Sequence, residues 1–292
     1  MFAELFAIAA PVFLIAGLGA LWAKLKAPFD GAVASNLALN VGTPCLAFAS
    51  LTRFHMPAAE LARLGLSALV IMAVTGVLGI ITLRLMRLQP NSYLPTVVFG
   101  NSGNMGLPLV LFAFGEKGLA LAIGYLAATA MTNLTVGEAI ARGHITIRSI
   151  YRSPILYGLG AAVVFILFDL PVPQFVASTT KLLGDLAIPL MLLALGHSLV
   201  KLQVRSFGLA ALIAAMRLGL GFVAGHIAAY LLGLDGTGRA VAILMASMPA
   251  AVANYVFALR YGRDHETVAG AVVLSTLASF ATLPLLLLYL LP

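Results

Sequence analysis

The residues best suited to bind a small molecule form a polar, proline-containing segment inside an apolar stretch of the chain. It reads Gly100-Asn101-Ser102-Gly103-Asn104-Met105-Gly106-Leu107-Pro108. Its three glycines and its proline make it a poor helix, because glycine loses backbone entropy and proline has no N–H to donate. In lipid, the backbone groups freed by such a break must find a protein or water partner. We therefore expect Asn101, Ser102, Asn104 and Pro108 to line a substrate-binding cavity.

A second break is expected in the other half of the chain, at Ser247-Met248-Pro249. Pro249 frees the carbonyl of Met245, and Asn254 and Tyr255 follow it closely. The second half-helix of a break begins with free N–H groups that carry partial positive charge and attract anions. We expect Pro249, Asn254 and Tyr255 to complete the site. A pair of proline kinks without any ligand is the competing interpretation.

Two charged residues inside apolar runs each have two possible interpretations. Arg217 lies at a depth where a cation is expensive, so it must face a cavity or a partner. It is either the counter-ion of a carboxylate substrate or a structural group bonded to a carboxylate or to the carbonyls of a broken helix. Asp185 is a candidate carrier of a coupling proton, since burial raises the pKa of a carboxyl group. A helical ion pair with Lys181 is the simpler interpretation of Asp185.

Uncharged polar side chains supply further candidates. Thr129, Thr132 and Asn133 are candidates for a coupling-ion or substrate site beside the first break. Hydrogen bonding between membrane helices is the alternative for these three. Asn40 and Thr43, just before a proline, either face the substrate or satisfy the backbone of a kink.

The composition indicates that these residues lie within a membrane. Of 292 residues, 62% are hydrophobic and 9% are charged, whereas a soluble domain has about 25% charged residues. The net charge of +7 is spread between apolar runs, which indicates topology signals and not a nucleic-acid-binding face. The single cysteine, Cys45, excludes an internal disulfide and a multi-cysteine metal site.

Apolar runs of about 20 residues, long enough to cross about 30 Å of hydrocarbon, predict ten transmembrane helices and no β-barrel. The predicted spans are 3–22, 31–51, 64–84, 94–114, 118–140, 154–169, 176–199, 206–232, 239–260 and 267–291. We expect an all-α, multi-pass protein of the cell (inner) membrane, with the lipid bilayer as its solvent. The first span has its positive charges behind it, so we expect it to be retained and not cleaved as a signal peptide.

Basic residues predict the orientation, because Lys and Arg are enriched in cytoplasmic loops. The loops after the odd-numbered spans hold Lys24, Lys26, Arg84, Arg87, Arg142, Arg148, Arg152, Lys201, Arg205, Arg260 and Arg263. The loops after the even-numbered spans hold Arg53, Arg63, Lys117, Lys181 and Arg239. We therefore expect the odd loops in the cytoplasm and both termini outside it.

Five spans on each side of the midpoint predict a single membrane domain made of two inverted repeats, about 1–145 and 146–292. An odd number of spans in each half makes the two halves cross the membrane in opposite orientations. The pair Asn40 and Pro44 recurs as Asp185 and Pro189, each 145 positions later.

At these residues the chain resembles the auxin efflux carrier (PIN-like) family, in the form of a bacterial member. The resemblance rests on the Gly100–Pro108 segment and on three weaker motifs. These are Leu39-Asn40-Val41-Gly42-Thr43-Pro44, Ala187-Ile188-Pro189-Leu190 and Ser247-Met248-Pro249.

The resemblance implies that the broken spans 4 and 9 cross at the substrate site. It implies a scaffold of spans 1, 2, 6 and 7, which often forms a homodimer, and an elevator-like transport part of spans 3–5 and 8–10. The implied function is secondary transport of a small organic anion, such as a dicarboxylate or an auxin-like carboxylate. The related bile acid sodium symporters are the alternative, but span 9 lacks the acidic residue that they use for sodium. Coupling to H⁺ or Na⁺ is left open.

Other classes of function find little support in the sequence. An intramembrane metalloprotease needs a His-Glu-x-x-His helix, which is absent from the chain. Rhomboid-type and aspartyl protease motifs are missing, and no repeated filter motif indicates a channel. The chain has no nucleotide-binding motif, so neither ATP nor any other cofactor is expected. An enzyme or a channel is therefore the weaker hypothesis.

Overall fold

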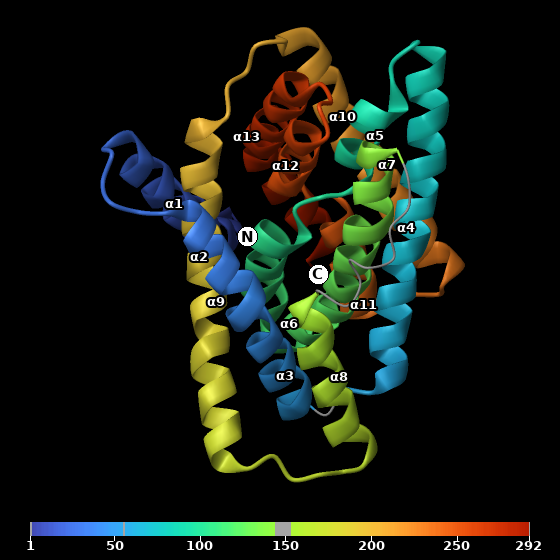
Figure 1. The fold of residues 1–292 in the computed structure, drawn as a ribbon. Coiled ribbons are helices and arrows are strands. Elements are labelled where there is room, and N and C mark those ends of the chain that lie inside the picture. Colours follow the sequence, from blue (N-terminus) through green and yellow to red (C-terminus); the bar gives the residue numbers. More distant parts are fainter. Residues whose placement is uncertain (1, 55, 144–152, 292) are drawn as a thin grey trace.

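The computed structural model describes residues 2–54, 56–143 and 153–291, which are helical almost throughout (Figure 1). The α-helices are α1 (Phe2–Lys24), α2 (Gly31–Leu37), α3 (Thr43–Phe54), α4 (Ala58–Leu85), α5 (Pro90–Val98), α6 (Leu107–Thr132), α7 (Glu138–Arg142), α8 (Pro154–Leu167), α9 (Gln174–Lys201), α10 (Phe207–Leu231), α11 (Gly236–Ala246), α12 (Val252–Arg260) and α13 (His265–Leu290). Short π-helical turns are η1 (Ala38–Gly42), η2 (Ser102–Gly106) and η3 (Asn133–Gly137). The predicted all-helical class is confirmed.

The helices overlap the predicted spans along the sequence. Six predicted spans correspond to the single helices α1, α4, α8, α9, α10 and α13. Four are composite, because α2 continues through η1 into α3, α11 is followed by α12, and α6 takes part in both 94–114 and 118–140. By length and composition, six helical stretches among the described residues could cross a membrane: Gly31–Phe54, Ala58–Leu85, Ser102–Arg142, Gln174–Lys201, Phe207–Leu231 and His265–Leu290. Three shorter apolar helices are Ile8–Lys24, Pro154–Leu167 and Gly236–Ala246.

The chain turns back on itself between the predicted spans 94–114 and 118–140, within α6. Within α6, Gly115 has φ 66° and ψ −167°, a backbone conformation that suits glycine, and it divides the helix in two. Beside this turn, Glu116 forms an ion pair with Arg53 near the end of α3. At the start of α5, the Tyr93 hydroxyl donates to Asp264 over 2.7 Å. The start of α5 therefore contacts the loop between α12 and α13, whereas the Gly115 turn lies beside the end of α3.

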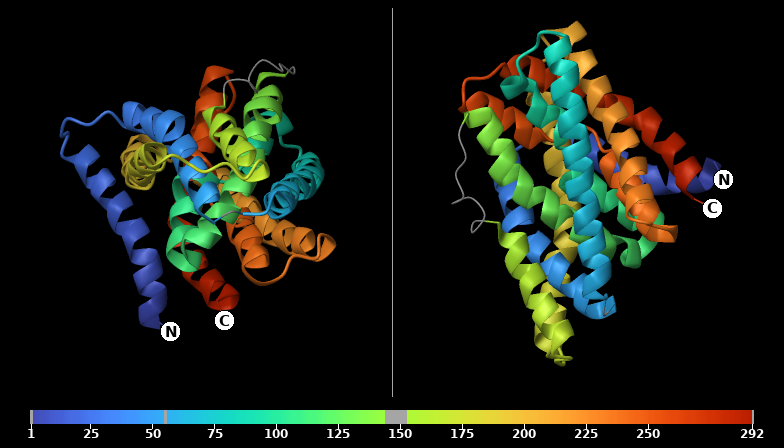
Figure 2. Two further views of the ribbon diagram at one scale, coloured as in Figure 1. Left: turned by 90° about the horizontal axis from the view of Figure 1, so that it is seen from below. Right: turned by 90° about the vertical axis from the view of Figure 1, so that its right-hand side faces the viewer.

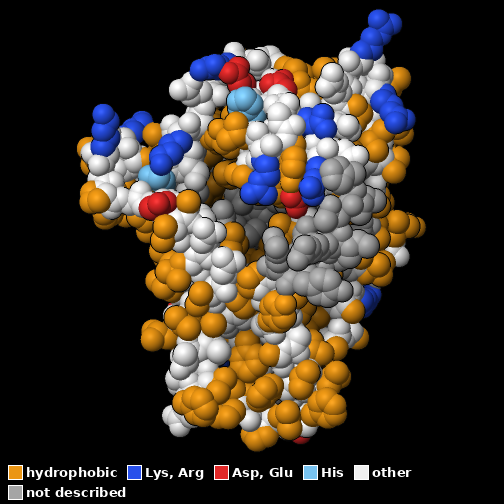
Figure 3. Space-filling view, viewed as in Figure 1, with side chains coloured by type: hydrophobic (Ala, Val, Ile, Leu, Met, Phe, Trp, Pro, Cys, Tyr) orange, Lys and Arg blue, Asp and Glu red, His pale blue; other side chains and the backbone are white. Residues whose placement is uncertain are grey.

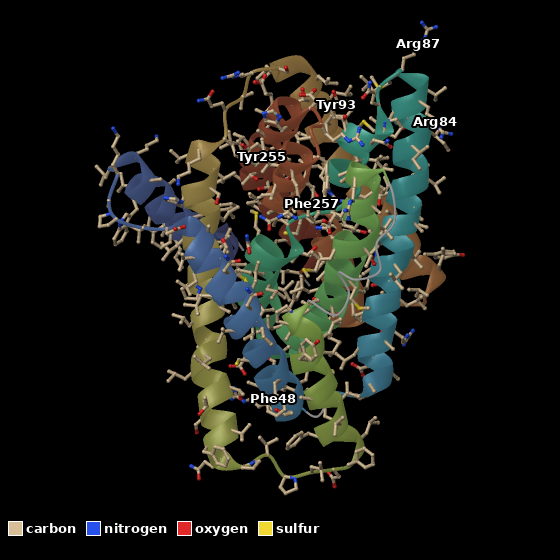
Figure 4. The ribbon with its side chains drawn as sticks, viewed as in Figure 1. Phe48, Arg84, Arg87, Tyr93, Tyr255 and Phe257 are labelled. Carbon is tan, nitrogen blue, oxygen red and sulfur yellow. The ribbon has the colours of Figure 1, made fainter. Side chains whose placement is uncertain are left out.

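Charged and apolar side chains are distributed unevenly over the surface. On the face shown in Figure 3, Lys and Arg gather toward the upper end, and hydrophobic side chains cover most of the lower part. Figure 4 shows Arg84 and Arg87 at that upper end and Phe48 near the lower end. Leu182 and Tyr230 are 75% and 87% exposed, as side chains that face lipid would be. The basic residues Arg148 and Arg152 of the prediction lie outside the described residues.

Helix contacts divide the structure into two groups. One group packs α1, α2, α3, α8 and α9 together, with α9 at the left of Figure 1. The other packs α4, α5, α6 and α7 with α10, α11, α12 and α13, and α4 is at the right. The groups meet where α3 contacts α6, where α9 contacts η2, and where α1 contacts α6 and α13. Figure 2 shows that α1 begins and α13 ends on the same side of the molecule.

Small residues allow close helix crossings in the first group. A Cβ atom added to Gly42 would lie 2.8 Å from the Cβ of Ala187, so η1 and α9 touch almost backbone to backbone. A Cβ on Gly158 of α8 would lie 2.2 Å from the carbonyl oxygen of Pro44. Gly42 and Ala187 are 145 positions apart, which is the offset of the predicted repeat.

Candidate substrate-binding site

The first break lies between α5 and η2. The backbone leaves the helical conformation at Phe99, with φ −97° and ψ 105°, and Asn101 has φ −80° and ψ 56°. The carbonyl oxygen of Asn101 then accepts from the N–H groups of Met105 at 3.3 Å and Gly106 at 3.1 Å, which opens the π-helical turn η2. Pro108 lies in the first turn of α6, where a missing N–H disturbs least.

The second break lies between α11 and α12. The hydroxyl of Ser247 donates to the carbonyl oxygen of Ile243 over 2.8 Å, which closes the last turn of α11. Pro249 follows, and Ala251 is extended, with φ −73° and ψ 140°, directly before α12. Both predicted breaks are therefore present in the structure.

The two breaks pair with each other. Gly100 and Ala250 form an isolated antiparallel bridge. The N–H of Asn101 donates to the carbonyl oxygen of Pro249 over 2.7 Å, and the N–H of Ala251 donates to that of Phe99 over 3.2 Å. The buried segments thus satisfy each other's backbone groups, as an apolar environment requires. Four half-helices, α5, η2–α6, α11 and α12, meet at this crossing.

The side chain of Asn254 strengthens the crossing. Its Nδ2 donates to the carbonyl oxygen of Phe99 over 2.9 Å, and the residue is 2% exposed. Asn254 thus places an amide of α12 on the first break. Its Oδ1 has no hydrogen-bond partner.

Arg217 reaches the crossing from α10. It is 1% exposed, and its Nη1 donates to the carbonyl oxygens of Val97 at 2.9 Å and Val98 at 2.6 Å. Its Nη2 donates to the carbonyl oxygen of Ala246. Both terminal nitrogens of the guanidinium are therefore bonded to main-chain carbonyls, which is the structural interpretation left open by the sequence. A direct contact with substrate is not needed to explain its position.

Several buried polar atoms among the described residues have no hydrogen-bond partner. They are Thr96 Oγ1, Asn101 Nδ2, Asn133 Oδ1, Arg217 Nε and Asn254 Oδ1. Asn133 lies close to the crossing, because a Cβ added to Gly137 would be 2.4 Å from Asn133 Oδ1 and 2.7 Å from the Phe99 ring. Leaving a buried polar atom unpaired costs about 1–3 kcal/mol, so a ligand or water that bonds these atoms would be stabilised.

The other predicted site residues are distributed as follows. Ser102 is buried beside Asn101, whereas Asn104 and Tyr255 are partly exposed. The hydroxyls of Thr129 and Thr132 donate to carbonyl oxygens of their own helix, Tyr125 at 2.9 Å and Ala128 at 2.8 Å. These two hydroxyl protons are therefore already engaged.

Three predicted residues belong to elements other than the broken ones, namely η1, α3 and α9. Asn40 is exposed on η1, and Thr43 donates to the carbonyl oxygen of Ala38 over 2.9 Å. Asp185 accepts from Lys181 over 2.6 Å, and both side chains are 58% exposed. The ion pair between Lys181 and Asp185 agrees with the simpler interpretation of these two residues.

A cavity of about 770 Å³ lies between α3, α6, α9 and the α8–α9 loop. Leu46, Leu111, Phe112 and Ile188 supply apolar walls. Two ion pairs also line it, Lys181 with Asp185 and Arg53 with Glu116. The second of these pairs links α3 to the Gly115 turn of α6. No motif in the sequence indicated this pair, because its members are 63 residues apart.

The comparison with known proteins decides the family. A sequence profile described as membrane transport protein matches residues 5–144 and 138–287, which is almost the whole chain. The chain belongs to this membrane transport protein family. The family consists of transporters and not enzymes, and its membership agrees with a multi-pass membrane protein. The predicted resemblance to auxin efflux carriers is confirmed.

Three relatives illustrate the range of similar proteins. An uncharacterized transporter of Methanothermobacter thermautotrophicus is 26% identical over 267 residues, covering 88% of each chain. A probable auxin efflux carrier component 5b of Oryza sativa is 30% identical over 145 residues, or 47% of this chain and 39% of its own. Auxin efflux carrier component 1 of Arabidopsis thaliana is 28% identical over 150 residues, or 49% of this chain and 24% of its own. This chain thus matches only part of each plant carrier.

Proposed function

We propose that this chain is a secondary transporter that binds a small organic anion, a carboxylate, where the breaks at Phe99–Asn101 and Pro249–Ala251 cross. The observation that supports this most is the antiparallel pairing of the two breaks around the unpartnered amide nitrogen of Asn101. Broken helices in corresponding positions of two repeats are the usual place for a transporter's substrate. An amide N–H can donate directly to a carboxylate.

The electrostatics of the four helix ends favour an anion. The segments η2–α6 and α12 begin at the crossing, and helix N-termini carry partial positive charge. The opposite ends, the C-termini of α5 and α11, are compensated by the guanidinium of Arg217. The positive ends therefore dominate the local potential. Arg217 contributes through its charge, while its terminal nitrogens remain on the backbone.

Alternating access by an elevator motion suits the two packing groups. All four half-helices and Arg217 belong to the group of α4–α7 and α10–α13, so the site would move with that group. The group of α1–α3, α8 and α9 would act as the scaffold and as the expected homodimer interface. The contact of Gly42 with Ala187, 145 positions apart, supports inverted repeats, because equivalent elements of such repeats meet near their two-fold axis. We place the basic ends of the helices in the cytoplasm and both termini outside it.

Thermal stability of the purified protein tests the substrate class. A panel of mono- and dicarboxylates is compared with neutral and cationic solutes of similar size. A ligand at one hundred times its Kd stabilises by about 2.7 kcal/mol, which is measurable. The expected result is stabilisation of the wild-type protein by a carboxylate and its loss in Asn101→Ala. The exposed Asn91→Ala, on the same broken element, is the matched control. Stabilisation only by neutral or cationic solutes would contradict the anion assignment.

A further inference from the structure

The guanidinium of Arg217 lies where two helix C-termini converge. The last carbonyls of a helix have no intrahelical partner and carry partial negative charge. Val97 and Val98 end α5, and Ala246 ends α11. Arg217 bonds to carbonyl oxygens of both helices at once. Without a cation between them, these two negative ends would face each other in an apolar interior.

The surroundings of Arg217 leave room for this one side chain. A Cβ added to Gly221, one turn along α10, would lie 2.4 Å from Arg217 Nη2 and 2.3 Å from the carbonyl oxygen of Ala246. A Cβ on Gly100 would lie 3.4 Å from the Arg217 guanidinium carbon. Glycine at both positions lets the guanidinium lie against the backbone of the crossing. Few other side chains could replace it, because the planar guanidinium bonds to several acceptors at once.

We propose that the guanidinium of Arg217 takes the place of a bound coupling cation at the crossing. Transport then requires no Na⁺ at this position. The inference rests on the proposed function. In transporters with broken helices, unwound carbonyls and half-helix C-termini are the groups that coordinate a coupling cation. In this chain, the carbonyl oxygens of Val97, Val98 and Ala246 already accept from the guanidinium. A metal ion would have to compete with a charged group that is covalently attached.

A fixed charge changes the charge balance of the cycle. Arg217 belongs to α10, which packs against α5 and α11, so its charge would move out and back with the site. Its contribution then cancels over a complete cycle. Arg217 therefore adds no net charge to the cycle, and transport would not respond to a Na⁺ gradient through this position.

The experiment measures the thermal stability of the full-length purified protein in different cations at constant ionic strength. For the wild type we expect the same Tm in Na⁺, K⁺ and choline. Arg217→Ala is expected to lower Tm, and millimolar guanidinium, but not choline, is expected to restore much of the loss, because it would fill the place of the side chain. Arg217→Lys keeps one charge but cannot bridge both helices in the same way, so an intermediate Tm is expected.

Arg63 provides a matched control. Its Nη2 also donates to carbonyls at a helix end, those of Leu232 at 2.8 Å and Gly233 at 3.0 Å, but the residue is exposed. Arg63→Ala should show no specific response to guanidinium, because water can solvate those carbonyls. Specific stabilisation of the wild type by Na⁺ would overturn the inference. An unchanged Tm of folded Arg217→Ala protein on addition of guanidinium would overturn it too. These measurements contain no carboxylate substrate, so failure to bind carboxylates counts against the proposed function alone.

Discussion

The N–H of Asn101 lies 2.7 Å from the carbonyl oxygen of Pro249, so the breaks in the two halves of the chain hold each other directly. Together with the bond from Ala251 to Phe99, this forms one antiparallel bridge between helical segments. Side chains add further donors beside this bridge. Asn254 gives the carbonyl oxygen of Phe99 a second donor, and Arg217 donates to the carbonyl oxygens of Val97 and Val98.

Replacing Asn254 with alanine should destabilise the protein by about 0.5–1.5 kcal/mol, because the buried carbonyl of Phe99 loses one of its two donors and keeps the N–H of Ala251. Asn254→Asp should be at least as harmful, since a carboxylate would face that carbonyl oxygen. The measurement is the free energy of unfolding, or Tm in one detergent. Asn36→Ala, on an exposed site of α2, serves as the control. Equal Tm values for Asn254→Ala and the control would show that the bond contributes little.

Two glycines of α10 should respond in opposite ways to alanine. Gly221→Ala should cost about 1–3 kcal/mol, because the new Cβ would collide with Arg217 and with the carbonyl of Ala246. Gly219→Ala, two residues earlier, meets no atom within 4 Å and should be neutral or stabilising by up to about 1 kcal/mol. Comparison of their Tm values checks this. A small loss of stability in Gly221→Ala would mean that the guanidinium can shift without losing its hydrogen bonds.

The positions of the helices followed from the sequence because uninterrupted apolar runs have few other outcomes in a membrane protein. The breaks at Gly100 and Pro249 were predictable for the same reason, since glycine and proline weaken helices locally. The Lys181–Asp185 pair followed from helical spacing alone. Each of these features depends on residues that are near one another in the sequence.

Features that depend on distant residues did not follow from the sequence. Arg217 had two equally suitable partners, a carboxylate or main-chain carbonyls, and only the fold brings the ends of α5 and α11 to it. The pair between Arg53 and Glu116 also joins separate elements. The π-helical turns η1 and η2 escaped prediction, because the same residues can continue an α-helix with slightly different hydrogen bonding.

A cross-link between positions 53 and 116 should stop transport. In an elevator motion α3 stays in the scaffold while the Gly115 turn of α6 moves, so the Arg53–Glu116 contact must break. Cysteines are placed at both positions in a Cys45→Ala background, because Cys45 is the native cysteine. A short, thiol-cleavable bis-methanethiosulfonate reagent should abolish solute flux in proteoliposomes, and reduction should restore it.

The control for the cross-link joins two positions within one packing group, such as Lys181 and Asp185 on α9. That cross-link should leave flux largely unchanged. Full transport by protein that is cross-linked between 53 and 116 would contradict a motion of α6 relative to α3.

The contact between Tyr93 and Asp264 should make stability depend on pH. Burial pushes the pKa of Asp264 up, but hydrogen bonds from Thr267 and Tyr93 outweigh it, so the pKa lies below its ordinary value of 3.8. A lowered carboxyl pKa contributes stability above the unfolded-state value, and that stability is lost as pH falls through the folded-state value. Tyr93→Phe should therefore be less stable than wild type at pH 7, and the difference should shrink below about pH 4. A constant difference across this range would exclude the carboxylate as the cause.

Counterflow of a labelled carboxylate in proteoliposomes tests the central claim, that the crossing is the anion site, most directly. The carboxylate is the one that raises the wild-type Tm most, and its half-saturating concentration is compared in wild type, Asn101→Ala and Asn91→Ala. A lost hydrogen bond to a charged group is worth about 1.5–3 kcal/mol, so Asn101→Ala should raise that concentration roughly tenfold to a hundredfold. Asn91→Ala should match the wild type. Unchanged saturation in a well-folded Asn101→Ala protein would place the anion elsewhere.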